Sequence, residues 1–75
     1  IIMEKKFIEK LIQVMEIEDH EVKMEDEFRE YDEWSSLAYL SLIAMYDEDY
    51  DVQMEEAEFK KLRTVEDLYN ATMQN

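Results

Sequence analysis

The chain of 75 residues contains no cysteine, no glycine and no proline. Without cysteine, neither a disulfide framework nor a thiolate metal site can stabilise the fold. Glycine and proline are the residues that most readily form tight turns and interrupt helices, so their absence argues against a hairpin-rich sheet. The composition therefore predicts an all-α protein whose helices are joined by ordinary loops.

Basic residues are also scarce: eight Lys and Arg stand against 21 Asp and Glu, a formal net charge of -13. Nucleic-acid binding is disfavoured, because neutralising phosphates requires Lys and Arg on the binding face. A negative charge of this density keeps molecules apart in solution, so we expect a monomer. The expected partners are proteins with basic surfaces.

Long apolar runs are missing as well, and every run falls short of the roughly 20 residues that span a bilayer. We therefore expect no membrane insertion, and a soluble protein of the cytoplasm. At this length we expect residues 1–75 to form one small domain. Such a domain buries only about 60% of the surface that its unfolded chain exposes, so its stability should be modest.

Apolar residues recur at steps of three and four from Glu4 to about Met15, which predicts a helix with one apolar stripe. The stripe consists of Phe7, Ile8, Leu11, Ile12 and Met15. From Glu16 to Glu33 acidic residues alternate with isolated apolar ones, which predicts a long loop with a helical turn around residues 25–29. Loops of this length inside compact domains are usually functional or disordered. We interpret the spaced apolar residues as anchors that pack the loop down as a lid.

A second helix is expected to begin at two serines, with Ser35 as N-cap and Ser36 at the first helical position. Apolar residues cover so much of its circumference that we expect this helix to lie centrally. Its predicted core residues are Leu40, Ile43 and Tyr46. The acidic residues at its end have the wrong sign for the helix dipole, which fits a recognition surface and fits a solvated face equally well.

A short helix is expected over about residues 55–60. The last helix should start at Thr64, with Asp67 as a shorter replacement for the capping-box glutamate. The expected core residues of this half are Phe59, Leu62, Val65 and Leu68.

Three motifs, in this order, resemble the acyl carrier protein family across nearly the whole chain. Ser35-Ser36-Leu37 and the apolar run after it resemble the D-S-L start of the family's second helix. Residues 47–51, DEDYD, resemble the acidic end of that helix, and residues 64–68, TVEDL, resemble the start of the last one. The resemblance implies a small four-helix bundle of acyl-carrier-protein type, with a long loop between helices one and two and a short third helix.

The resemblance also implies a function. Ser36 would receive a covalent 4'-phosphopantetheine from a phosphopantetheinyl transferase, and the thiol of that arm would hold acyl or related groups as thioesters. The protein would be no enzyme itself, but would deliver its cargo to acyl-transferring and acyl-modifying enzymes with basic docking patches. Leu37, Asp47, Glu48 and Asp49 match the positions that such enzymes recognise. No residue selects among fatty acyl, polyketide, aminoacyl and other cargoes.

Position 35 departs from the family, which has aspartate there. In the family that carboxylate lies beside the attachment site and near the divalent metal of the transferase. An unmodified, carrier-like acidic module that binds a basic partner protein is therefore the alternative. Because Ala38 and Ser41 occupy positions where many members have acids, contacts near Ser36 should be apolar, with Trp34, Leu37 and Tyr39 as candidates.

Two further readings are disfavoured by the residues. Asp47, Asp49, Asp51 and Glu58 imitate the ligand spacing of an EF-hand calcium loop, but Val52 stands where the loop needs glycine. A serine hydrolase needs a base beside its nucleophile, and the one histidine, His20, belongs to the acidic loop. We expect His20 to be exposed, with a pKa raised by carboxylates, and we expect no resident metal.

Overall fold

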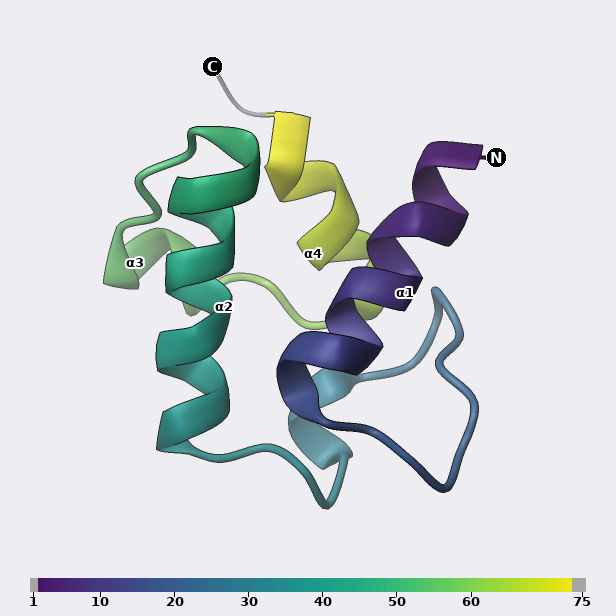
Figure 1. The fold of residues 1–75 in the computed structure, drawn as a ribbon. Coiled ribbons are helices and arrows are strands. Elements are labelled where there is room, and N and C mark those ends of the chain that lie inside the picture. The colour runs from purple at the N-terminus through teal and green to yellow at the C-terminus, as the bar shows by residue number, and fades with distance from the viewer. Residues whose placement is uncertain (1, 74–75) are drawn as a thin grey trace.

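The computed structural model describes residues 2–73, so residues 1, 74 and 75 of the expected domain lie outside the described part. The elements, in chain order, are α1 (Ile2–Met15), the 3-10 turn η1 (Phe28–Glu30), α2 (Ser36–Tyr50), α3 (Glu56–Phe59), α4 (Val65–Asn70) and the 3-10 turn η2 (Ala71–Met73). Helices α1 and α2 run antiparallel, and α4 lies between them in the upper half of the view (Figure 1). The all-α prediction is confirmed for residues 2–73, which contain no strand and one isolated bridge.

The apolar residues of α1 that face the core are those that their spacing predicts. Phe7, Leu11 and Met15 are buried, while Ile8 and Ile12 are half-buried and pack against the core. The ring of Phe7 lies 5.6 Å from that of Tyr69, which joins the middle of α1 to α4. The apolar face of α1 is thus covered by the C-terminal half of the chain.

Helix α2 buries Tyr46, as expected, but not Leu40. Leu40 is 60% exposed, so its assignment to the core was wrong, and Ile43 is only half-buried. The buried face of α2 consists of Ala38, Leu42, Met45 and Tyr46. The apolar residues of this helix occur on all of its sides, so their spacing does not indicate which side is buried.

Tyr46 fixes the choice of face. Its hydroxyl donates a 2.6 Å hydrogen bond to the carbonyl oxygen of Leu68 in α4. The side chain is fully buried, and this burial raises the pKa of its hydroxyl above the ordinary value for tyrosine. A buried hydroxyl must have a partner, so the orientation of α2 depends on a contact with α4.

The loop between α1 and α2 packs onto the start of α4, as the lid interpretation predicts. The carbonyl oxygens of Asp26 and Met24 accept hydrogen bonds from the backbone of Val65 and Glu66, at 2.9 and 2.8 Å. These two N–H groups belong to the first turn of α4, where no intrahelical acceptor exists. The helical turn in this loop is η1, slightly later than expected, and its Phe28 is fully buried.

The predicted capping box of α4 is present in full. The hydroxyl oxygen of Thr64 accepts from the backbone N–H of Asp67 at 3.1 Å, and the Asp67 carboxylate accepts from the N–H of Thr64 at 3.1 Å. The N–H of Arg63 also donates to this carboxylate, at 2.9 Å. These backbone donors lower the pKa of Asp67. Helix α3 is shorter than expected, and Phe59 is its buried residue.

Arg29 is a structural residue that the sequence did not indicate. Its guanidinium group donates to the carbonyl oxygens of Phe59, at 3.1 Å, and of Leu62. It also lies over the rings of Phe28 and Phe59, at 4.7 and 5.2 Å from their centroids. One of the few basic side chains therefore holds the end of α3 against the long loop.

Because the chain has no glycine, residues with a Cβ end the two long helices. Glu16 after α1 has φ 58° and Asp51 after α2 has φ 56°. The turn at Glu16 lets the N–H of Ile17 donate to the Ile12 carbonyl at 3.0 Å. A left-handed conformation is unfavourable for residues other than glycine, and glutamate has no compensating local hydrogen bond of the aspartate type.

Glu16→Gly should therefore raise the free energy of unfolding by about 0.5–1 kcal/mol, even though glycine adds entropy to the unfolded chain. The melting temperature should rise by a few degrees. The matched control is Glu16→Gln, which removes the charge but keeps the Cβ. An equal gain in both variants would assign the effect to charge near the helix C-terminus and not to the backbone.

Within residues 2–73, no helix combines the length and the apolar character that crossing a membrane requires.

Candidate functional site

The serine pair at the start of α2 adopts the predicted arrangement. Ser35 is the N-cap, with extended backbone (φ -165°, ψ 172°), and its hydroxyl oxygen accepts a 3.1 Å hydrogen bond from the backbone of Ala38. Ser36 is the first helical residue and is exposed. The capping role thus belongs to Ser35, which leaves the Ser36 hydroxyl facing solvent.

The helix start offers an environment suited to a phosphate. The first N–H groups of a helix have no intrahelical acceptor, and only that of Ala38 is used by the cap. The positive end of the helix dipole favours negative charge at this end. A phosphodiester on Ser36 would therefore find donors and a favourable field beside it.

Apolar surface adjoins Ser36. Leu37, the next residue, is 73% exposed, and Leu40, one turn further along α2, is also exposed. A shallow groove of about 370 Å³ runs between α2 and the segment before α3. Its lining residues are Leu40, Ile43, Ala44, Asp47, Gln53, Met54 and Glu55. Leu40 lines this groove, and Leu37 lines a second, smaller groove that contains Ser35, so each leucine offers apolar surface to a partner protein.

Trp34 and Tyr39 do not belong to this exposed surface. The ring of Trp34 stacks on Phe59 with centroids 6.0 Å apart, and the ring of Tyr39 meets Phe59 edge-on at 5.0 Å. Both residues are half-buried against the core. Ala38, at a position where many members of the resembled family have an acid, is buried. Of the three apolar contact candidates, only Leu37 is fully available.

The acidic end of α2 is exposed, but two of its three carboxylates already have partners. Asp49 forms an ion pair with Lys10 of α1 at 3.1 Å, and Asp47 accepts a 2.8 Å hydrogen bond from Gln53. Glu48 lies between them and is exposed. A basic partner would therefore meet carboxylates whose positions are partly fixed by contacts with α1 and with the segment after α2.

The EF-hand reading is wrong. Asp47 and Asp49 lie within α2, Asp51 is its left-handed C-cap and Glu58 lies in α3, so no calcium loop connects them. Among the described residues, they are not part of any group of carboxylates close enough to share a metal ion.

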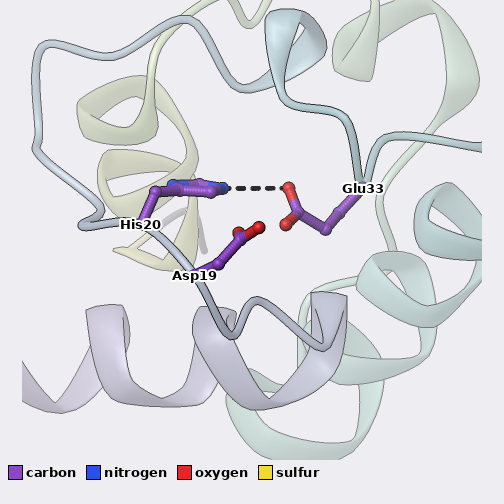
Figure 2. A group of neighbouring side chains, drawn as sticks. All are labelled: Asp19, His20 and Glu33. Carbon is purple, nitrogen blue, oxygen red and sulfur yellow. Dashed lines mark hydrogen bonds and ion pairs between the residues drawn. The ribbon is translucent and has the colours of Figure 1, made fainter.

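A different group of side chains meets where the long loop begins and ends. Asp19 and His20, which follow α1, approach Glu33, which precedes α2, as Figure 2 shows. His20 Nε2 lies 3.0 Å from a Glu33 carboxylate oxygen, and Nδ1 donates to the carbonyl oxygen of Glu21 at 2.8 Å. The hydrogen bonds to Glu33 and Glu21 raise the pKa of His20, while the pKa of Glu33 is lowered.

His20 is exposed and has a raised pKa, as expected, but its meeting with Glu33 was missed. Residues 13 positions apart meet only because the loop folds back on itself. The one feature of the sequence that could have indicated this contact was a single histidine in an acidic segment. The imidazole is engaged by Glu21 and Glu33 and not by a serine, so it is not arranged as a base for Ser36.

Comparisons of the chain with protein-family models, with curated proteins and with solved structures found no match.

Proposed function

We propose that the protein is a carrier of acyl or related groups, with 4'-phosphopantetheine attached to Ser36. The observation that carries this proposal is the division of roles at the start of α2, where Ser35 caps the helix and Ser36 presents a solvent-exposed hydroxyl. The order of helices, with a long loop before α2 and a short α3, supports the same reading.

In the attachment reaction, Ser36 Oγ attacks the phosphorus of coenzyme A that bears the pantetheine arm. A P–O bond of the pyrophosphate breaks, adenosine 3',5'-bisphosphate leaves and the serine proton passes to a base of the transferase. The product is a phosphodiester with a terminal thiol. That thiol then exchanges acyl groups as thioesters, which explains how a chain without cysteine would do thiol chemistry, and tethering raises the effective concentration of the cargo at each enzyme.

Docking to partner enzymes would use the exposed side of α2. Leu37 and Leu40 supply apolar contact beside Ser36, and Asp47, Glu48 and Asp49 supply negative charge at the other end of the helix. Complementary basic patches would speed encounter, and the attraction would weaken as salt is added.

The proposal is tested by incubating the protein with coenzyme A, magnesium and a promiscuous phosphopantetheinyl transferase, followed by intact-mass spectrometry. A gain of one phosphopantetheine per chain is expected. Refusal by several transferases would contradict the proposal and would favour the alternative, an unmodified acidic module. The observation that favours this alternative is the missing aspartate at position 35.

Replacing Ser35 with aspartate should raise the rate of attachment by about tenfold or more. Aspartate caps helices as well as serine does, so the fold is retained. It also adds the charge that a transferase's divalent metal can meet, an interaction worth a few kcal/mol when partly desolvated. Initial rates of attachment for wild type and Ser35→Asp check this, with Ser35→Asn as the uncharged capping control. Equal rates for Asp and Asn would show that charge at position 35 does not limit the reaction.

A further inference from the structure

We propose that Asp19, His20 and Glu33 form a zinc-binding site at the point where the long loop closes on itself. Each residue offers one ligand atom, and these three atoms lie within 4.8 Å of one another. Figure 2 shows the three side chains turned toward a common space, with the imidazole on one side and the two carboxylates on the other. This inference does not depend on the modification of Ser36.

The imidazole is held in the orientation that a metal ligand needs. The carbonyl oxygen of Glu21 can only accept, so Nδ1 carries a proton and donates to it at 2.8 Å. Ligating histidines usually hold their second ring nitrogen in this way, which fixes the ring and its tautomer. The ring also lies 4.8 Å from that of Tyr31. Nε2 is therefore the nitrogen that faces Glu33, and a metal would replace the proton there, which passes to water.

The donor set and its size favour zinc. Imidazole nitrogen with carboxylate oxygens suits zinc, whereas calcium and magnesium prefer ligand sets made of oxygen alone. Two ligand atoms on a tetrahedral zinc lie about 3.4 Å apart, given bonds of about 2.0–2.1 Å. Nε2 and Glu33 Oε1, at 3.0 Å, are already near this separation. Rotation of the exposed Asp19 side chain would close the remaining gap, and water would complete the coordination.

A metal ion at this site would cross-link the two ends of the long loop. It would tie residue 20 to residue 33, across 13 positions of sequence, and would bring in the adjacent residue 19. Glu33 also lines the small groove, about 120 Å³ in volume, that contains Ser35 and Leu37. Zinc would therefore hold the segment that leads into α2 against the end of α1. Because only the folded state presents this site, zinc binding would raise the melting temperature.

The first test is a zinc titration of the wild type followed by NMR of the histidine ring, for which the chain's single histidine leaves no ambiguity. We expect the His20 ring signals to move and to saturate at one zinc per chain, while magnesium at the same concentration leaves them in place. Ring signals that do not respond to zinc would overturn the proposal.

The second test is calorimetry with zinc on ligand variants. His20→Gln, Asp19→Asn and Glu33→Gln should each weaken zinc binding at least as much as the loss of an outer-shell partner does, which is about tenfold or more. The control is the double variant Glu56→Gln, Glu58→Gln, which removes two distant carboxylates and should leave the zinc affinity unchanged. If the control weakens binding as much as His20→Gln does, zinc is held by the general negative charge and no defined site exists.

Discussion

Replacing Ser36 with alanine should abolish enzymatic attachment of phosphopantetheine, whereas Ser35→Ala should still permit it. The structure separates the two hydroxyls by role. Ser35 Oγ accepts the N–H of Ala38 and caps α2, while the Ser36 hydroxyl is exposed at the first helical position. Loss of the cap should cost about 1 kcal/mol of stability. Loss of Ser36 removes the proposed nucleophile and should leave stability almost unchanged.

The two effects are measured separately, attachment by intact mass and stability by thermal unfolding. The expected pattern is reciprocal: Ser36→Ala is stable and unmodified, and Ser35→Ala is less stable and modified. Attachment to Ser36→Ala that proceeds as in wild type would place the nucleophile elsewhere. Equal destabilisation by both variants would contradict the capping assignment of Ser35.

Replacing Arg29 with alanine should lower the free energy of unfolding by about 2–4 kcal/mol. The variant loses two charge-assisted hydrogen bonds to the carbonyls of Phe59 and Leu62, each worth about 1.5–3 kcal/mol at most. It also loses cation–π contact with Phe28 and Phe59, worth about 0.5–1 kcal/mol or more. In a domain of this size the melting temperature should fall by at least about 8 °C.

Arg63 provides a matched control for Arg29. Its ion pair with Glu27 spans 3.1 Å between side chains that are 70% and 51% exposed, and such pairs contribute at most about 1 kcal/mol. Arg63→Ala changes the net charge by the same amount, so the difference between the two variants reports the contacts of Arg29 alone. Arg29→Lys should not restore stability, because an ammonium cannot reproduce the planar fork of donors. Equal melting temperatures for Arg29→Ala and Arg63→Ala would refute this role.

The features that the sequence predicts well are those set by neighbouring residues. Ser35 caps α2, and Thr64 and Asp67 form a reciprocal capping box, because each hydrogen bond joins atoms three residues apart. The stripe of α1 is likewise readable, since polar residues mark its other side. Local chemistry therefore locates the starts of α2 and α4 and the position of the candidate site, whereas α1 begins at Ile2, before the expected Glu4.

What the sequence does not predict depends on contacts between distant segments. The buried side of α2 follows from the bond between Tyr46 and Leu68, which lie 22 positions apart. Arg29 meets carbonyls 30 and 33 positions away. The pairing of His20 with Glu33 needs the folded loop. Spacing within one segment carries no information on such contacts.

The acidic end of α2 shows how the structure refines a charge pattern. Asp47, Glu48 and Asp49 have the same charge, but Lys10 engages Asp49 and Gln53 engages Asp47. A basic partner would have to compete with both contacts. Glu48 is therefore the residue of the three that a basic partner can bind without first breaking a contact within the protein.

Attachment of the phosphopantetheine arm to Ser36 can be checked by peptide-resolved tandem mass spectrometry of the wild type after enzymatic treatment. Both adjacent serines remain in the protein, so fragment ions that separate residue 35 from residue 36 decide between them. We expect the whole added mass to lie on Ser36. An arm on Ser35 or on another residue, or no arm after treatment with several transferases, would contradict this expectation.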